Sequence, residues 1–385
     1  MKTTTLGTAA LALGTAFLAA FAPSRAAAAG RGAPYPPSPV IAGIRFDRSA
    51  WFKAAPGSDQ FGATWARDGN LYAAWGDGGG FGGTNSKGRS SLGVARIEGT
   101  PPHWRGVNVW GGFKPLSPQK PILGKTSGGV IAVGGAIYLY VVEQGVWTNN
   151  RLWRSTDLGM SWKDLGPVFN EPGAAFADPG ILQFGPDYKG ARDGYVYGYS
   201  EKPWKNGLAL FRAPKERLAQ RKAYEFFAGL DAEGRPRWTR DIRKMKPVFT
   251  DPNGTEWGVT CVFAPALKRY LLAVRHHGDS GAWGLFDAPE PWGPWTVVAY
   301  GDDLPQWTYT PDPHGASAGR PAWMHTFPAK WMSADGATVW QISDRGDQFN
   351  VVKARLLLRG QARPQARDRA GARVWSGPIR RPAAQ

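Results

Sequence analysis

The sequence contains a single cysteine and only one long apolar run. Cys261 is the one cysteine among 385 residues, so an intrachain disulfide and a zinc site built on several cysteines are excluded. It lies in the apolar run 258–263, which predicts a buried, unreactive thiol. The long apolar run, Leu6 to Phe21, follows Lys2 and precedes small residues at 24–29, as in a secretory signal. We therefore expect a signal peptide at 1–29, no membrane span, and a secreted or periplasmic protein.

Acidic residues are also scarce relative to basic ones. The chain has 47 Lys and Arg against 30 Asp and Glu, a net charge of +17. Part of this excess lies after Leu358, where the sequence has seven arginines and one acidic residue, Asp368. Adhesion to an anionic surface is one interpretation of the charge. Because no RNA- or DNA-binding motif accompanies it, we expect no nucleic-acid partner and interpret 361–385 as a solvated basic tail.

Glycine, proline and aromatic residues are abundant. The 51 glycines and 32 prolines occur too often for long helices, which excludes a helix bundle. Hydrophobic residues make up 42% of the chain and include 19 tryptophans, so a disordered chain is excluded as well. The composition predicts an all-β protein with many turns.

Apolar strands recur as five hairpins, each followed by a further strand. Asp-Gly and Gly-Gly turns, which suit tight hairpins, connect several of them. We expect a five-bladed β-propeller over 58–360, preceded by a lead-in segment at 30–57. A β-sandwich with long insertions is the alternative, but it does not explain five similar hairpins. The predicted strand pairs are 61–66 with 71–75, 128–132 with 136–142, 180–184 with 195–199, 258–263 with 270–274, and 331–333 with 338–342.

One turn has a more specific pattern. Residues 155–162 read S-x-D-x-G-x-x-W and resemble the Asp-box of sialidase-like propellers. In those proteins the motif is a structural hairpin, so the resemblance implies that Asp157 shapes a turn and is not catalytic.

Acidic residues flank the first hairpin on both sides. Asp59 precedes its first strand and Asp77 follows its second, each about nine residues from the turn, so antiparallel pairing brings both to one end. In a propeller, the corresponding ends of all blades converge on one face. The other hairpins place further polar residues there, and we predict that these bind substrate: Glu143, Asp178, Glu256, His276 and Arg345.

Two carboxylates across a small gap suit glycoside hydrolysis. One holds a proton for the leaving oxygen, while the other is ionised and activates water or attacks the sugar. Mutual repulsion and burial would separate their pKa values. Asp59 and Asp77 are therefore the predicted catalytic pair. The alternative is that each acid only shapes a turn.

The same residues carry a family resemblance. Ser58-Asp59-Gln60-Phe61-Gly62 and Trp75-Gly76-Asp77-Gly78 resemble the first blade of secreted bacterial glycoside hydrolases that include endo-D-arabinanases, long known only as a domain of unknown function. Residues 283–295 and 328–336 resemble later blades of that group. The resemblance implies a five-bladed propeller with both catalytic acids in the first blade, at Asp59 and Asp77.

The sequence thus predicts an exported, monomeric glycoside hydrolase that acts on a polysaccharide, for example of arabinan type. No cofactor is expected and no metal ligand is assigned. A non-catalytic propeller that binds glycan or a cell-envelope component is the alternative. A sialidase is disfavoured, because Gly43-Ile44-Arg45-Phe46 does not match the early arginine motif of those enzymes.

Overall fold

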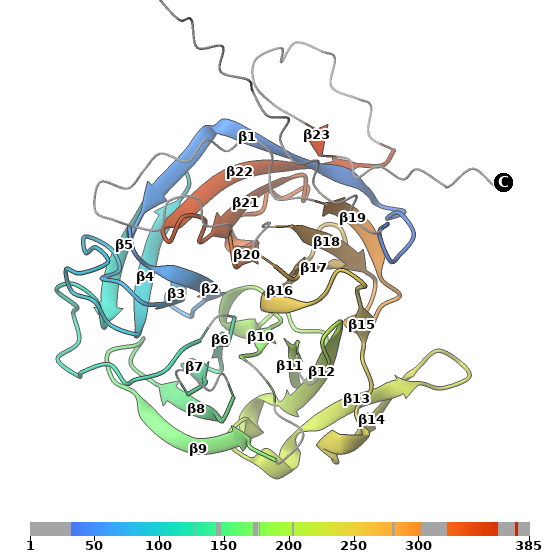
Figure 1. Ribbon diagram of the computed structural model, residues 1–385, viewed down its shortest axis with the longest axis horizontal. Helices are drawn as coiled ribbons and strands as arrows, with labels where there is room; N and C mark the ends of the chain where they lie inside the picture. Colours follow the sequence, from blue (N-terminus) through green and yellow to red (C-terminus); the bar gives the residue numbers. More distant parts are fainter. Residues whose placement is uncertain are drawn as a thin grey trace, which may run out of the picture. The chain divides into compact units, whose positions relative to one another are not determined.

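Five antiparallel sheets form the fold in a computed structural model of the protein (Figure 1). The structure describes residues 32–126, 128–143, 148–171, 176, 178–201, 204–278, 282–301, 322–360 and 374–375. The first two sheets comprise β2 (Asp59–Trp65), β3 (Leu71–Gly76), β4 (Leu92–Thr100) and β5 (His103–Trp110), then β6 (Val130–Val133), β7 (Ala136–Val141), β8 (Asn150–Ser155) and β9 (Lys163–Phe169). The third comprises β10 (Gly180–Ile181), β11 (Tyr195–Ser200), β12 (Gly207–Pro214), β13 (Glu225–Leu230), β14 (Pro236–Thr239) and β15 (Phe249–Thr250). The fourth comprises β16 (Glu256–Ala264), β17 (Arg269–Arg275), β18 (Trp283–Ala288) and β19 (Thr296–Gly301).

The fifth sheet joins the two ends of the described chain. Its order is β20 (His325–Thr326), β21 (Thr338–Ser343), β22 (Phe349–Leu358), β1 (Ile41–Ala54) and β23 (Val374–Trp375). β1 pairs with β22 along most of its length, from Ile41 opposite Leu358 to Ala54 opposite Phe349. Most of the predicted lead-in at 30–57 therefore forms a strand of the fifth blade.

The innermost strands of neighbouring sheets are joined in a ring by hydrogen bonds. The connected pairs are β2 with β6, β6 with β10, β10 with β16, β16 with β20, and β20 with β2. The bonds are Ala132 N to Thr64 Oγ1 (2.9 Å), Ile181 N to Gly128 O (3.0 Å), Gln183 N to Cys261 O (3.0 Å), Thr260 Oγ1 to His325 O (2.7 Å) and Thr326 Oγ1 to Phe61 O (3.2 Å). These contacts close the five sheets into a β-propeller, as the sequence predicted, with the five strands nearest the centre (Figure 1).

Four of the five predicted hairpins form at the predicted places, and the fifth does not. Its inner strand is β20 at His325–Thr326, whereas Trp331 ends a 3-10 helix, η5 (Ala329–Trp331). Pro328 precedes this turn and cannot donate to a strand ladder. The other 3-10 helices are η1 (Pro186–Tyr188), η2 (Lys215–Arg217), η3 (Arg221–Ala223) and η4 (Ile242–Lys244).

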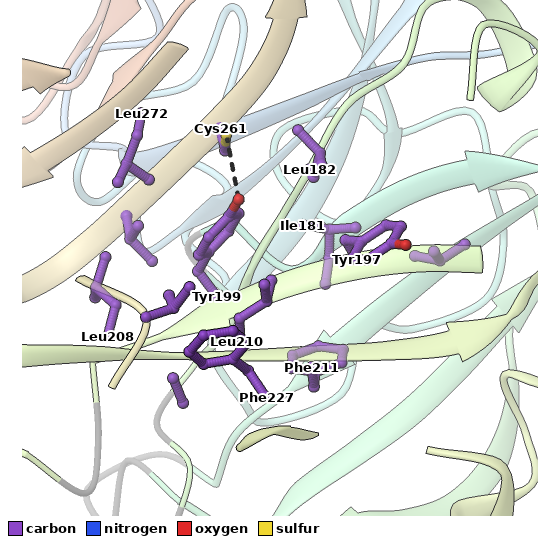
Figure 2. Close-up of a cluster of buried hydrophobic side chains, with 14 of the residues drawn as sticks. Ile181, Leu182, Tyr197, Tyr199, Leu208, Leu210, Phe211, Phe227, Cys261 and Leu272 are labelled. Atoms are coloured by element: carbon purple, nitrogen blue, oxygen red, sulfur yellow. Dashed lines mark hydrogen bonds between the residues drawn. The ribbon is translucent and has the colours of Figure 1, made fainter. Parts of the chain in front are cut away.

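Large apolar side chains fill the spaces between the sheets. Figure 2 shows one such cluster, in which side chains from β10, β11 and β12 meet others from β16 and β17. Cys261 lies in it, 2% exposed, with its sulfur 3.9 Å from the Tyr199 hydroxyl. Burial raises the pKa of this thiol far above its usual value, which confirms the predicted unreactive cysteine.

The turn between β8 and β9 is held by its own side chains. Asp157 Oδ1 accepts hydrogen bonds from Ser155 Oγ (2.8 Å) and from Ser161 N (2.9 Å). Gly159 has φ 88°, which favours glycine, and its carbonyl accepts the indole N–H of Trp162 (3.1 Å). Asp157 therefore stabilises a turn.

Contacts divide the chain into two units, Met1–Gly30 and Arg31–Gln385, and every described residue belongs to the second. The predicted signal peptide, and the basic tail apart from β23, lie outside the described residues. Among the described residues, no helix is long and apolar enough to cross a bilayer.

Candidate active site

A β-bulge at the start of β2 positions the first of the predicted catalytic acids. Asp59 lies opposite Gly76, but the next pair is Gly62 with Ala74, so the first strand holds one residue more than its partner. The extra residue is accommodated at Gln60, whose φ is 58°. Asp77 follows Gly76 and has φ 50°. A positive φ is uncommon for residues other than glycine, so both Gln60 and Asp77 adopt an uncommon backbone conformation. Asp59 and Asp77 therefore lie at the same end of the first hairpin, as predicted.

Asp59 is surrounded by protein although part of its side chain remains exposed. Its Oδ1 is buried and accepts no hydrogen bond from the described residues. Burial raises the pKa of this carboxyl well above its usual value, and Lys125 opposes the rise. Asp344, Asp77 and Asp347 add to the rise through charge repulsion. Asp59 thus favours the protonated form.

Asp77 is in the opposite electrostatic environment. Its Oδ1 lies 2.6 Å from Lys125 Nζ and 3.3 Å from Arg89 Nη2. The Lys125 side chain is 4% exposed, whereas those of Asp77 and Arg89 are 31% and 46% exposed. Two cations therefore compensate the charge of Asp77, and the nearer one is buried.

Gly76 allows the acids and the lysine to approach each other. A Cβ at this position would lie 2.9 Å from Asp59 Oδ1 and 3.4 Å from Lys125 Cδ. Lys125 comes from the second blade, where its backbone pairs with Val142. The group of Asp59, Asp77 and Lys125 therefore spans two blades.

Asp344 connects the first blade to the fifth. Its Oδ2 accepts Gln60 N (2.8 Å), and its Oδ1 accepts Trp323 N (2.7 Å) and Met324 N (3.0 Å). It is fully buried, and burial raises its pKa to about 6 although these hydrogen bonds act against the rise. Asp344 therefore fixes the backbone beside Asp59.

Two further predicted residues lie beside this group. Asp178 is 9% exposed, and its Oδ1 accepts a hydrogen bond from Thr126 Oγ1 at 3.5 Å. Thr126 follows Lys125 in the chain. Arg345 follows Asp344 and is partly buried, which lowers the pKa of its guanidinium.

Glu256 belongs to a second polar group on the fourth blade. Its Oε2 lies 2.6 Å from Nη1 of Arg275, which is 1% exposed, and accepts Gly278 N at 3.2 Å. A bulge again follows the acid, because Glu256 pairs with Arg275 but the next pair is Thr260 with Ala273. The first and fourth blades thus share the same local arrangement, in which a β-bulge follows an acidic residue.

Two of the residues predicted to bind substrate have protein partners. His276 is 3% exposed and packs against Tyr300, with Nε2 at 3.2 Å from Asp251 Oδ2, and its role in substrate binding stays a prediction. His276 and His277 follow the end of β17, and His277 is the one near Glu256, with Nδ1 3.9 Å from Oε2. Glu143 is exposed and accepts Asn149 Nδ2 (2.9 Å) within its own loop.

The sequence-based reasoning missed Lys125 and the role of Asp344. Lys125 lies shortly before the inner strand of the second unit, the position that acids occupy in the first and third. A polar residue just before an inner strand was therefore the sequence signal that could have identified Lys125 as a site residue. The three backbone partners of Asp344 come from the first blade and from the segment before β20, so its role depends on the tertiary structure.

Close backbone packing forms the base of the site. Gly128 and Gly180 come from the second and third blades and meet Val259 of the fourth. A Cβ at Gly180 would overlap the carbonyl oxygen of Val259, and one at Gly128 would lie 2.9 Å from it. The second, third and fourth blades therefore pack backbone against backbone at this point of the ring.

Chemically, the first-blade group offers one carboxyl that favours its proton and one carboxylate held by cations. That combination suits general acid–base chemistry or nucleophilic attack on an acetal. Among the described residues, no three His, Cys, Asp or Glu side chains come together as a metal site.

Comparison with known proteins supports the fold. Residues 127–314, a little under half of the chain, match the model of a domain of unknown function (DUF4185). A search of curated proteins found no match. Among solved structures, a protein of Bacteroides ovatus ATCC 8483 described as a proposed hydrolase is similar with a TM-score of 0.51 and 12% identity, over 79% of this chain and 86% of that one.

Other similar structures are glycoside hydrolases. An alpha-L-arabinofuranosidase of Podospora anserina has a TM-score of 0.44 and 11% identity, over 84% of this chain and 94% of its own. A GH43_1 enzyme of Xanthomonas citri has a TM-score of 0.44 and 13% identity, over 78% and 87%. At such identities the likeness concerns the fold, and the activity has to be argued from the site.

Proposed function

We propose that this protein is a glycoside hydrolase whose catalytic acids are Asp59 and Asp77. The observation that carries the proposal is the contrast between two acids at one end of the first hairpin. Burial raises the pKa of Asp59, whereas Asp77 is paired with Lys125 and Arg89. Pairs of acids in contrasting environments are what glycoside hydrolysis requires.

The environments assign the roles. Asp59 keeps its proton and donates it to the glycosidic oxygen as the bond to the leaving sugar breaks. Asp77, held by Lys125 and Arg89, acts as the carboxylate at the anomeric carbon, either by removing a proton from the attacking water or by attacking directly. Lys125 holds Asp77 in place and limits the rise in the pKa of Asp59. The configuration of the released sugar distinguishes the two roles of Asp77.

The substrate that we propose is a neutral polysaccharide, with arabinan-type chains as the first candidate. This choice is supported by the resemblance of 58–62 and 75–78 to the endo-D-arabinanase group. We also propose that the protein is exported and acts as a monomer. The support for export is the N-terminal sequence pattern at 1–29.

Asp59→Asn and Asp77→Asn test the assignment. Wild-type protein and both variants are incubated with purified arabinogalactan, arabinan and other cell-wall polysaccharides, and products are measured by mass. We expect each variant to lose at least about a hundredfold in rate, since removal of one acid–base group typically costs this much. Asp164→Asn, on the outer strand β9 and paired with Arg151, is the control that keeps activity.

Near-wild-type rates in both variants would contradict the proposal. Binding of a polysaccharide that both variants retain, with no cleavage by the wild type, would instead favour the non-catalytic glycan-binding alternative.

A further inference from the structure

Two tryptophans lie beside the second polar group. Trp257 is the second residue of β16 and Trp323 lies two residues before β20, and both strands are near the centre of the ring (Figure 1). Trp257 and Trp323 have ring centroids 5.4 Å apart at an interplanar angle of 35°. Both are partly exposed, although most large aromatic side chains of the propeller are buried. We call these two residues the tryptophan pair.

Buried groups fix Trp323 from behind. The Arg275 guanidinium lies 4.0 Å from the Trp323 ring centroid, and Arg275 is 1% exposed. The same guanidinium donates to Glu256 Oε2 at 2.6 Å and to Gly278 O at 2.7 Å. An indole in contact with a buried, hydrogen-bonded arginine is pre-organised, so little freedom is lost when a ligand stacks on it.

Trp257 is held in an unfavourable backbone conformation. Its φ is 22°, which is rare for a bulky residue. The cause lies next to it, where Gly258 (φ 79°) packs so closely that a Cβ there would overlap the Trp323 carbonyl oxygen. The bulge and this backbone contact together orient Trp257 toward Trp323. Such strain is typically retained where function requires it.

The tryptophan pair is connected to the proposed catalytic group. Asp344 accepts the backbone N–H of Trp323 through one oxygen and that of Gln60, next to Asp59, through the other. One buried carboxylate therefore links the backbone of Trp323 to the backbone next to Asp59.

Glu256 supplies a polar partner beside the rings. All its described contacts run to Oε2, from Arg275, Gly278 and His277, and its side chain is 30% exposed. Oε1 is thus available to accept a hydrogen bond from a hydroxyl group. Flat aromatic faces with a fixed hydrogen-bond acceptor fit the C–H face and hydroxyls of a sugar.

We propose that the tryptophan pair and Glu256 form a subsite that binds a neutral sugar residue flanking the linkage that is cut. This inference rests on the proposed function for the position of the linkage, but binding itself does not require catalysis. A subsite beside the cleaved linkage means that the substrate is longer than one sugar, so that the enzyme binds a saccharide chain.

The test measures binding without turnover. In an Asp77→Asn background, affinity for soluble arabinogalactan and arabinan is measured by affinity electrophoresis and by quenching of tryptophan fluorescence, with dextran as a second neutral probe. We expect Trp323→Ala to weaken binding at least tenfold and Trp323→Phe to retain most of it. Glu256→Gln is expected to weaken binding severalfold, because an amide oxygen still accepts a hydroxyl.

Trp238→Ala is the matched control. Trp238 is also partly exposed and lies 4.1 Å from an arginine, Arg212, but on the outer strand β14. We expect it to leave binding unchanged, and melting curves of all variants confirm that they fold.

Equal affinity of Trp323→Ala and Trp238→Ala would overturn the proposed subsite. The proposal would also fail if the Asp77→Asn protein bound none of the probes. Binding that depends on Trp323 in a protein that cleaves nothing would support the subsite and contradict only the proposed hydrolase activity.

Discussion

Lys125→Met removes the buried cation that pairs with Asp77 and acts on Asp59. We expect kcat/KM to fall about thirtyfold and the alkaline limb of the pH–rate profile to move to higher pH. The second effect has a definite sign. Lys125 lowers the pKa of Asp59, so its removal lets Asp59 keep its proton to higher pH. The acid form, which donates the proton, then persists where the wild type has lost it.

The magnitude follows from the geometry of the pair. Two unit charges about 4 Å apart interact by about 4 kcal/mol at an effective dielectric constant of about 20. Removing one partner of a fully buried pair costs about 3–5 kcal/mol, and an exposed pair contributes about 0–1 kcal/mol. Lys125 is buried but Asp77 is 31% exposed, so about 2 kcal/mol is expected, or roughly thirtyfold in rate.

Steady-state kinetics on a cleaved polysaccharide over a pH series measure both effects. Arg89→Met is the control, because Arg89 contacts the same Asp77 oxygen at 3.3 Å with 46% of its side chain exposed, and we expect only a few-fold loss. Lys125→Arg keeps the charge and should restore most of the activity. An unchanged rate and profile in Lys125→Met, with a melting temperature like the wild type, would refute the reasoning.

Three further predictions concern stability. Gly180→Ala should destabilise the fold by about 3 kcal/mol, because the added methyl meets backbone of Val259, whereas Gly194→Ala, with open space around it, should not; urea unfolding measures both. Burial lowers the pKa of His325 to about 3, so the unfolded chain gains a proton between pH 6.5 and 3 that the folded chain refuses. Wild-type protein should therefore lose about 2–3 kcal/mol of folding stability relative to His325→Gln between pH 7 and 4.5, and parallel unfolding curves would contradict this. Asp157→Ala should lower stability by about 1 kcal/mol through the β8–β9 turn without changing kcat, and a catalytic defect at equal folding would count against a structural role.

Local signals explain why most of the fold was predictable. The β2–β3 hairpin follows from the apolar runs on either side of Asp68-Gly69, and the pairing of Asp59 with Gly76 follows from the same turn. β1 was not predicted as a blade strand, because its partner β22 lies some three hundred residues away and no turn connects them. The two-residue β20 is too short to leave a pattern.

The site shows the same division between local and tertiary information. Asp59 and Asp77 are neighbours through one hairpin, so the sequence places them together. Lys125 reaches them from another blade, and its contact depends on how the blades pack. The partners of His276 and His277 lie on other segments, Asp251 for His276 and Glu256 for His277, so they depend on the tertiary structure.

The pairing of β1 with β22 has a consequence for synthesis. The first strand of the described chain lacks its partner until residues 349–358 have been made, so every shorter product carries two unsealed sheet edges. Termination before this point would leave β1 without its main partner, and the fifth blade would lose the strand that links β1 to β21. Completion of the fifth blade therefore requires residues 349–358 to reach residues 41–54.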